Sequence, residues 1–296
     1  MTRVGIAAIC VGLLAVAGCG SDEGGGEGLS DRLVDFSKQP PYVNSLERDP
    51  ESGEFLLTTN RGFFRIDPET EEARRQRGTI SADGESSTIG TFLELKYAQA
   101  GGLIGSGHPD QRTLPQYLGF IRSADDGRTW QVVSRLGTAD LHKIIEKHGR
   151  LYAWDAVLSA LLISDDGGRT FEEHFTPRGL IIDFEVDPGD PSRVVAATDD
   201  QLFRSEDDGE GWRPLLAAEG VRLAWPEADR LYRADKDGTV YRSADGGDSW
   251  EAAGTVEGEP YKIEPVSGDE LYIALSDGTI AHTSDGGAGW EYVFRP

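Results

Sequence analysis

Short apolar runs recur along most of the chain, and clusters of Asp, Gly and Pro separate them. Residues 180–216 illustrate the pattern with four such runs, "LIIDFEVDP", "SRVVAATDD", "QLFRSEDD" and "WRPLL". Apolar runs of this length, bounded by turn-forming residues, are typical of strands joined by hairpins. The pattern therefore predicts an all-β protein made of short antiparallel strands.

An acidic motif follows the third run in each of five successive segments. Its copies are "SADDGRTW" at 123, "SDDGGRTF" at 164, "SEDDGEGW" at 205, "SADGGDSW" at 243 and "TSDGGAGW" at 283. They begin 41, 41, 38 and 40 residues apart. Four strands in ~40 residues is the pattern of a propeller blade.

A weaker copy of the repeat, "GFFRIDPETEEA", begins at residue 62. Counting it, residues 31–296 are predicted to form a single β-propeller of four-stranded blades, with six blades expected and seven as the alternative. The first and second copies are 57 residues apart, counted from Ile66 to Ser123. This longer interval predicts an insertion of roughly one long loop.

The acidic motif itself is predicted to be a structural turn. Its aspartate is expected to accept backbone N–H groups, its glycine to supply positive φ, and its aromatic residue to be buried between strands or repeats. Five copies of one turn cannot all be active sites, and a calcium ion at each turn is the weaker alternative because each offers few oxygen ligands. The aspartates are Asp125, Asp166, Asp207, Asp245 and Asp285, and the glycines are Gly127, Gly168, Gly209, Gly247 and Gly287.

The motif resembles the Asp-box, or bacterial neuraminidase, repeat S-x-D-x-G-x-T-W, and the resemblance extends from about Tyr42 to Pro296. It implies a β-propeller similar to bacterial envelope proteins that are labelled glycosyl hydrolase or sialidase-like. Sialidases are expected to carry an Arg-Ile-Pro motif and an arginine triad. Here Arg65 and Ile66 are followed by Asp67, and no triad is evident, so sialidase chemistry is not expected.

The start of the chain predicts export and lipid attachment. Residues 1–18 combine Arg3 with an apolar run from Val4 to Ala17, which is typical of a signal peptide. "VAGC" resembles the bacterial lipobox, which implies a lipid on Cys19; an ordinary signal peptide with an incidental cysteine is the alternative. Residues 19–30 are rich in Gly and acidic residues and are predicted to be a flexible tether. The protein is therefore expected at the cell membrane, lipid-anchored and extracytoplasmic.

Charge narrows the choice of partners. The formal net charge is -23, with 52 acidic and 29 basic residues. This argues against nucleic acid as a partner and limits membrane contact to the lipid anchor. Both cysteines, Cys10 and Cys19, precede the predicted domain, so it has no thiol site, and no cofactor is expected.

Candidate binding residues gather in the second and third repeats, on the propeller face opposite the acidic turns. The long segment "GSGHPDQRTLPQYLG", predicted to be a loop over 105–119, carries His108 and Tyr117. The next repeat places His142 at the start of its first strand and Trp154 with Asp155 between its second and third strands. His108 and His142 are also weak candidates for a zinc or copper site.

Two functional hypotheses remain open from the sequence. The first is an envelope propeller that binds a protein or glycan partner on this face, with Trp154 stacking on a sugar in the glycan case. The alternative is a glycoside hydrolase, which needs two carboxylates about 5–9.5 Å apart. The candidate carboxylates are Asp110, Asp155, Asp199 and Asp235.

Overall fold

A computed structural model of the chain describes residues 42–296, and every regular element in them is a β-strand. The predicted signal peptide (1–18), the lipidation site Cys19 and the tether (19–30) lie outside the described residues. Residues 42–296 contain no helix of the length and hydropathy needed to cross a membrane. The prediction of an all-β propeller is confirmed.

Five sheets each contain four consecutive antiparallel strands, arranged from the centre outward in chain order. The first is β1 (Val43–Arg48), β2 (Phe55–Thr59), β3 (Gly62–Asp67) and β4 (Glu72–Gln76). The second is β10 (Leu141–Lys147), β11 (Arg150–Asp155), β12 (Ala160–Ser164) and β13 (Glu172–His174). The third is β14 (Ile181–Val186), β15 (Val194–Thr198), β16 (Gln201–Ser205) and β17 (Arg213–Ala217). The fourth is β18 (Arg222–Glu227), β19 (Arg230–Ala234), β20 (Thr239–Ser243) and β21 (Glu251–Thr255), and the fifth is β22 (Pro260–Pro265), β23 (Leu271–Leu275), β24 (Ile280–Thr283) and β25 (Glu291–Phe294).

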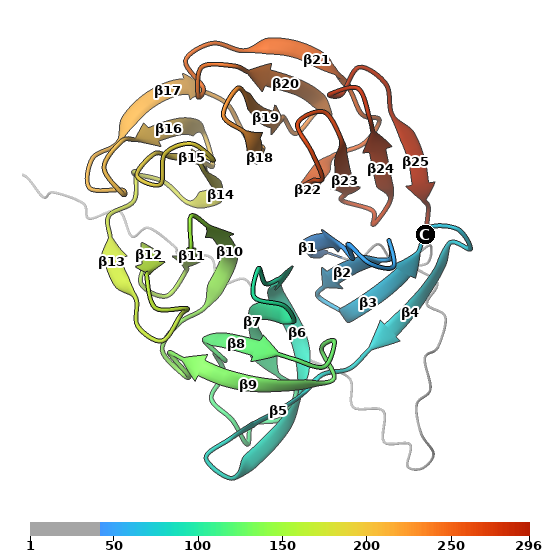
Figure 1. The fold of residues 1–296 in the computed structure, drawn as a ribbon, viewed down its shortest axis with the longest axis vertical. Coiled ribbons are helices and arrows are strands. Elements are labelled where there is room, and N and C mark those ends of the chain that lie inside the picture. Colours follow the sequence, from blue (N-terminus) through green and yellow to red (C-terminus); the bar gives the residue numbers. More distant parts are fainter. Residues whose placement is uncertain (1–41) are drawn as a thin grey trace, which may run out of the picture. The chain divides into compact units, whose positions relative to one another are not determined.

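The expected number of blades was wrong, because the propeller has five blades of four strands rather than six or seven. The remaining repeat forms a closed five-stranded barrel, which packs between the β1–β4 and β10–β13 blades (Figure 1). Its strands are β5 (Thr79–Ala82), β6 (Glu85–Tyr97), β7 (Leu103–Pro109), β8 (Phe120–Ser123) and β9 (Thr129–Ser134).

The barrel closes because the inserted residues form a strand where a loop was expected. β5 pairs antiparallel with β6 and parallel with β9, which joins the two edges of the sheet. Ile80 of β5 lies opposite Trp130, and both side chains are buried in one core with Phe92. Pairing residues about fifty positions apart in this way removes an exposed sheet edge.

Apolar clusters lie between neighbouring sheets and join them into a ring. One such cluster combines Leu46 and Phe64 of the first blade with Tyr272 and Phe294 of the last, so these two blades close the ring directly. The second strand of each four-stranded blade is buried almost throughout, because it is covered by sheets on both sides. This explains the nearly continuous apolar runs that the sequence shows at these strands.

The acidic turns join the third and fourth strands of their sheets. In each, Oδ1 of the aspartate accepts the backbone N–H of the residue four positions later at 2.8–3.0 Å. The preceding Ser or Thr hydroxyl accepts the N–H of the motif glycine at 2.8–3.0 Å. All five glycines have positive φ, as expected. The motif aromatics are Trp130, which is buried, and Phe171, Trp212, Trp250 and Trp290, which pack against the clusters between sheets.

Candidate functional site

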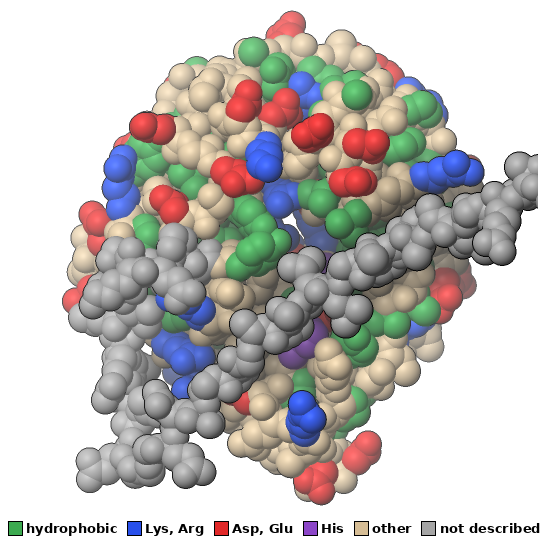
Figure 2. Space-filling view, turned by 180° about the vertical axis from the view of Figure 1, so that it is seen from behind, with side chains coloured by type: hydrophobic (Ala, Val, Ile, Leu, Met, Phe, Trp, Pro, Cys, Tyr) green, Lys and Arg blue, Asp and Glu red, His purple; other side chains and the backbone are tan. Residues whose placement is uncertain are grey.

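The ring has two faces with different construction. The acidic turns, together with the turns from first to second strands, form one face, which we call the turn face. The opposite face, the loop face, carries the starts of the inner strands and the loops from second to third strands. A hollow of about 290 Å³, the mouth hollow, lies there at the centre of the ring (Figure 2).

One residue at the equivalent position of each inner strand, β1, β6, β10, β14, β18 and β22, lines the mouth hollow. The six residues are Asn44, Leu93, His142, Ile182, Arg222 and Tyr261. For five of them the inner strand shifts register against the second strand at this point, for example between Leu141 and Lys143, so that His142 is bulged. A β-bulge re-aims side chains, and here each bulged residue lines the mouth hollow. In four of the five strands the next residue also lines a central hollow, namely Glu94, Lys143, Asp183 and Lys262. Arg222 is the exception, since it pairs in regular register with Ala234.

Ionic pairs fill the channel below the mouth hollow. Lys143 Nζ lies 2.5 Å from Asp183 Oδ1 and 3.1 Å from Glu185 Oε1, and Asp183 Oδ2 also accepts the backbone N–H of Leu223 at 2.9 Å. Burial acts to raise the pKa of Asp183, but the Lys143 charge outweighs it and the pKa is lowered. Lys262 lies 3.8 Å from Glu94, and its pKa is lowered by burial.

A second hollow of about 500 Å³ opens toward the turn face, and Lys143 and Lys262 line both hollows. Here Lys96 binds Glu47 and lies 3.6 Å from Glu264, and burial together with the Glu47 charge raises the pKa of Glu264 well above its usual range. Lys147 donates to the backbone carbonyls of Val186 and Trp225. Each of the described lysines that line this hollow has a carboxylate within ion-pair distance. The cluster therefore binds the inner strands to one another.

Three of the predicted site residues converge on Asp140, which the sequence analysis did not single out. His108 Nε2 lies 3.1 Å from Asp140 Oδ1, and His142 Nε2 lies 3.2 Å from Asp140 Oδ2. Asp155 is fully buried, and its Oδ1 accepts the backbone N–H of Asp140 at 3.0 Å. Burial acts to raise the pKa of Asp140, but the hydrogen bonds and charges of the two histidines hold it well below its usual range.

The distances from the two histidines to Asp140 are those of hydrogen bonds. Both imidazole Nε2 atoms face the Asp140 carboxylate at distances near 3 Å, whereas nitrogen ligands lie about 2.0–2.1 Å from zinc. Within residues 42–296 no group of three or more His, Cys, Asp or Glu side chains is placed to hold a metal ion.

Two other predicted binding residues take supporting positions. Trp154 lines the mouth hollow but is only 7% exposed, because it packs in the apolar cluster shared with the β14–β17 blade. Tyr117 packs edge-on against His108, with ring centroids 5.7 Å apart. His108 itself lies in β7, since residues 105–109 extend that strand and the loop begins only at Asp110. Expecting the whole of 105–119 to be a loop was therefore wrong.

The four candidate carboxylates do not face one another across the mouth hollow, and none of them lines it. Asp110 is exposed and accepts the Thr88 hydroxyl at 2.6 Å. Asp199 is exposed and accepts the N–H of Leu180, while Asp235 lies 3.5 Å from Arg233. Burial raises the pKa of Asp235, although the Arg233 charge opposes this. The carboxylate that does line the hollow, Asp183, is bound to Lys143.

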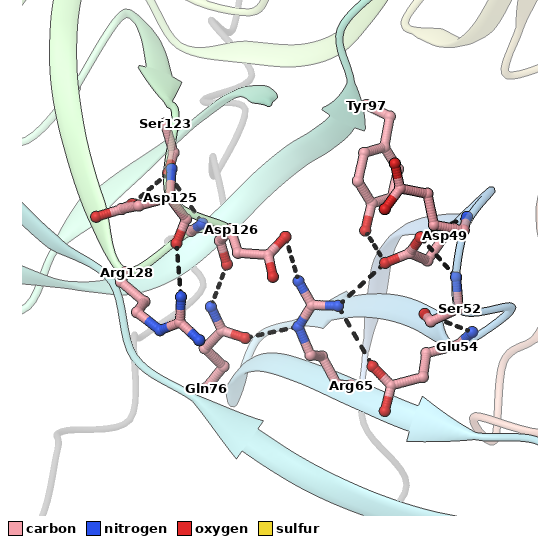
Figure 3. Close-up of polar contacts among 12 residues, drawn as sticks. Asp49, Ser52, Glu54, Arg65, Gln76, Tyr97, Ser123, Asp125, Asp126 and Arg128 are labelled. Carbon is pink, nitrogen blue, oxygen red and sulfur yellow. Dashed lines mark hydrogen bonds and ion pairs between the residues drawn. The ribbon is translucent and has the colours of Figure 1, made fainter. Parts of the chain in front are cut away.

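Arg65, the arginine of the "FRIDP" segment, lies on the turn face. Its guanidinium is surrounded by Asp49, Glu54 and Asp126, and its Nε donates to Gln76 Oε1 at 2.8 Å (Figure 3). Tyr97 of β6 donates to Asp49 Oδ2 at 2.7 Å. These contacts connect the first blade to the barrel. They leave Arg65 bound by acidic side chains and remote from the mouth hollow.

Sequence reasoning missed most of the residues that line the mouth hollow. A usable signal was present, because aligning the six repeats places Asn44, Leu93, His142, Ile182, Arg222 and Tyr261 in one column. This column holds six different residue types, whereas the aspartate and glycine columns of the acidic turn are unchanged in five of the six repeats. Where the repeats share their turn residues but differ in residue type at one position, the fold does not require a particular side chain at that position.

Comparisons with known proteins support the fold. No family model matches the chain. A stretch of 129 residues is 30% identical to the Dispase autolysis-inducing protein of Streptomyces mobaraensis, covering 43% of this chain and 33% of that protein. The chain thus spans only about a third of the length of this relative.

Three solved structures illustrate the structural similarity. YCF48 bound to D1 peptide matches with a TM-score of 0.53 at 15% identity, covering 87% of this chain and 98% of that chain. YCF48 from Cyanidioschyzon merolae gives 0.50 at 10% identity, with coverages of 89% and 88%. A GH74 enzyme from Niastella koreensis gives 0.50 at 13% identity, with coverages of 86% and 45%. At these identities the similarity shows the propeller fold alone.

Proposed function

We propose that this chain is a lipid-anchored propeller of the cell envelope that binds a protein partner on its loop face, centred on the mouth hollow. The proposal rests on six equivalent positions, one in each inner strand, whose different side chains all line the mouth hollow. Five of these side chains are brought there by β-bulges, and the sixth lies at a strand start of regular register. The repeats share their turn residues but differ in the side chain that faces the hollow. Different side chains gathered around one hollow are typical of a surface that recognises a specific partner.

Exposed apolar side chains on the loop face favour a protein as the partner. Tyr42 and Leu180 line the hollow and are 57% and 62% exposed, and Val157 and Leu158 lie in the loop between β11 and β12. Exposed apolar groups gathered in this way are typical of protein interaction sites. Stacking on a sugar would need the face of Trp154, which is packed in the core.

The same geometry disfavours the hydrolase alternative. A glycoside hydrolase requires two carboxylates flanking the scissile bond. Among the described residues that line the mouth hollow, Asp183 alone is a carboxylate, and it is bound by the buried Lys143. The structural similarity to YCF48 in its complex with D1 peptide is consistent with a propeller of this size accommodating a peptide.

Site-specific photo-crosslinking in the native host tests the proposal. A photoreactive residue at Leu180 is expected to give a discrete protease-sensitive adduct, because this side chain borders the hollow. Val266 is the matched control, since it is also apolar and 44% exposed but lies in the β22–β23 turn on the turn face. Equal adducts from both positions, or polysaccharide hydrolysis by the purified protein that is lost on changing Asp110 or Asp235 to Asn, would overturn the proposal.

A further inference from the structure

The mouth hollow carries positive charge in a strongly acidic protein. Among residues 42–296, its permanently charged lining residues are Lys143, Arg222, Lys262 and Asp183, which is three cations against one carboxylate. The chain as a whole has a formal net charge of -23. In Figure 2, Lys and Arg side chains occupy the depth of the central hollow, and acidic side chains lie toward the rim. Such an arrangement concentrates anions at the centre of the loop face.

Two of the three cations are already paired. Lys143 is held by Asp183 and Glu185, and Lys262 lies 3.8 Å from Glu94. Carboxylates already compensate the positive charges of these two lysines, so the lysines would contribute little to binding an anionic ligand.

The contacts of Arg222 differ from those of the two lysines, because they are made with Tyr261 and not with a carboxylate. Its Nε donates to the backbone carbonyl of Tyr261 at 2.7 Å, and its guanidinium carbon lies 4.8 Å from the centre of the Tyr261 ring. Among residues 42–296 no carboxylate lies within ion-pair distance of it, and its Nη1 atom is buried without a hydrogen-bond partner. A guanidinium fixed in position with unused donors is prearranged for an anionic group, and an unpaired donor there costs free energy until it is bound.

The residues around Arg222 indicate which kind of side chain would lie next to a bound anionic group. Tyr261 packs edge-on against Tyr42 with ring centroids 4.9 Å apart, and Leu180 borders the same hollow. An apolar side chain next to the acidic group would therefore be covered by these residues. Burial of that side chain adds affinity that a free anion lacks.

We propose that the partner is recognised through an Asp or Glu side chain, adjacent to an apolar residue, whose carboxylate binds Arg222 in the mouth hollow. This inference rests on the proposed function and specifies the chemistry of the partner segment. The Arg222 guanidinium supplies paired N–H donors to the carboxylate, and the Tyr42 and Tyr261 rings cover the neighbouring apolar group.

Selection of a displayed random-peptide library on the purified protein tests this inference. The selected sequences are expected to be enriched in Asp or Glu next to an apolar residue. Binding of synthetic copies should fall by about tenfold or more in Arg222→Gln, because a charge-assisted hydrogen bond is lost, and should fall less in Arg222→Lys, which keeps the charge. Arg178→Gln is the matched control, because Arg178 is exposed, precedes β14 on the same face and does not line the hollow.

The outcomes separate the two proposals. Peptides that bind Leu180→Asp as well as the unchanged protein would bind elsewhere, which counts against the loop-face site itself. Peptides that lose binding in Leu180→Asp but bind Arg222→Gln normally would keep the face and overturn the acidic anchor. Equal melting temperatures of the variants exclude misfolding as the cause. Asp35 is followed by Phe36, so the chain itself contains an acidic residue next to an apolar one before Tyr42. Tighter peptide binding after Asp35→Asn would show that this segment competes for the hollow, and self-association lost in Arg222→Gln would show that a second copy binds there. Either result would overturn assignment to a separate partner.

Discussion

At the residue scale, the acidic turns show how one motif can be strengthened or weakened by a single position. Hydrogen bonds from the Thr129 hydroxyl and N–H lower the pKa of Asp125 to about 2, and those from Thr170 lower the pKa of Asp166 to about 2. Gly211 and Gly289 replace this hydroxyl residue in two turns, where the aspartates keep the backbone N–H bond but not the hydroxyl bond. Those two turns are therefore held by one interaction fewer.

Stability should fall in acid as these turns lose their charge. The folded pKa of about 2 for Asp125 and Asp166 lies below the unfolded value of about 3.9. A lowered pKa adds stability that is complete above the unfolded pKa and is lost as the pH falls through the folded one. Urea unfolding between about pH 5 and pH 2 should show the midpoint falling with pH, and Asp125→Asn should reduce the slope; an unchanged slope would contradict this assignment.

The turn aspartates should matter for folding and leave binding unchanged. Asp125→Asn removes the charge that accepts the Thr129 N–H and hydroxyl groups, so a lower melting temperature is expected. Asp83→Asn is the control, because Asp83 is exposed in the β5–β6 turn and has positive φ, which Asn tolerates. Crosslinking through Leu180 should be the same in both variants, and its selective loss in Asp125→Asn would contradict a purely structural role.

At the element scale, β5 decides that the second repeat is a barrel. Ile80 is completely buried between β6 and β9 and contacts the cluster that contains Trp130. This cluster also holds Leu56 and Phe63 of the first blade. Closure of the barrel and its attachment to the first blade therefore depend on the same core.

Ile80→Ala should cost about 2–5 kcal/mol of unfolding free energy, because it leaves a cavity in that core. Thr79→Ala is the neighbouring control, since Thr79 is exposed and its ladder contacts are made by the backbone. Urea unfolding measures both variants. Equal stability of the two would show that β5 adds little to the barrel.

At the scale of the whole molecule, buried ionic pairs hold the six inner strands around the axis. Lys143 of β10 bridges to Asp183 and Glu185 of β14, and Asp183 also binds the N–H of Leu223 in β18. Burial acts to lower the pKa of Lys143, but the two acidic partners outweigh it and raise the pKa above its usual range. The charge network thus connects three consecutive blades.

Lys143→Met should destabilise the ring by about 3–5 kcal/mol, because it leaves Asp183 buried and uncompensated. Combining it with Asp183→Asn should restore part of the loss, since the amide keeps an acceptor for Leu223 without the charge. Lys236→Met, at an exposed surface pair, should change stability by at most about 1 kcal/mol. A double variant less stable than Lys143→Met alone would contradict the charge explanation.

Attachment to the membrane is also a property of the whole molecule, and it is predicted from residues outside the described range. Cys19→Ser should release the protein from the membrane fraction, because the thiol that would carry the lipid is removed. Cys10→Ser should leave it bound, since Cys10 lies within the predicted signal peptide. Fractionation followed by immunoblotting distinguishes these results, and retention of Cys19→Ser would refute lipid attachment.

Local patterns in the sequence determined much of this protein. The strand prediction for residues 180–216 matches β14 to β17, and the acidic turns follow from contacts within four residues of each aspartate. Such features depend on neighbours along the chain, so the sequence contains the information directly. The position of His142 next to the start of β10, which begins at Leu141, was predictable for the same reason.

Only the tertiary structure decided how the repeats close and where their side chains point. The barrel required Ile80 to pair with Trp130, fifty residues later, and the mouth hollow required bulges that turn residues such as His142 toward the axis. Asp140 and Arg222 became site residues because of what packs beside them. Pairing register and bulges depend on the space that neighbouring sheets leave, and no local pattern of apolar and polar residues encodes that space.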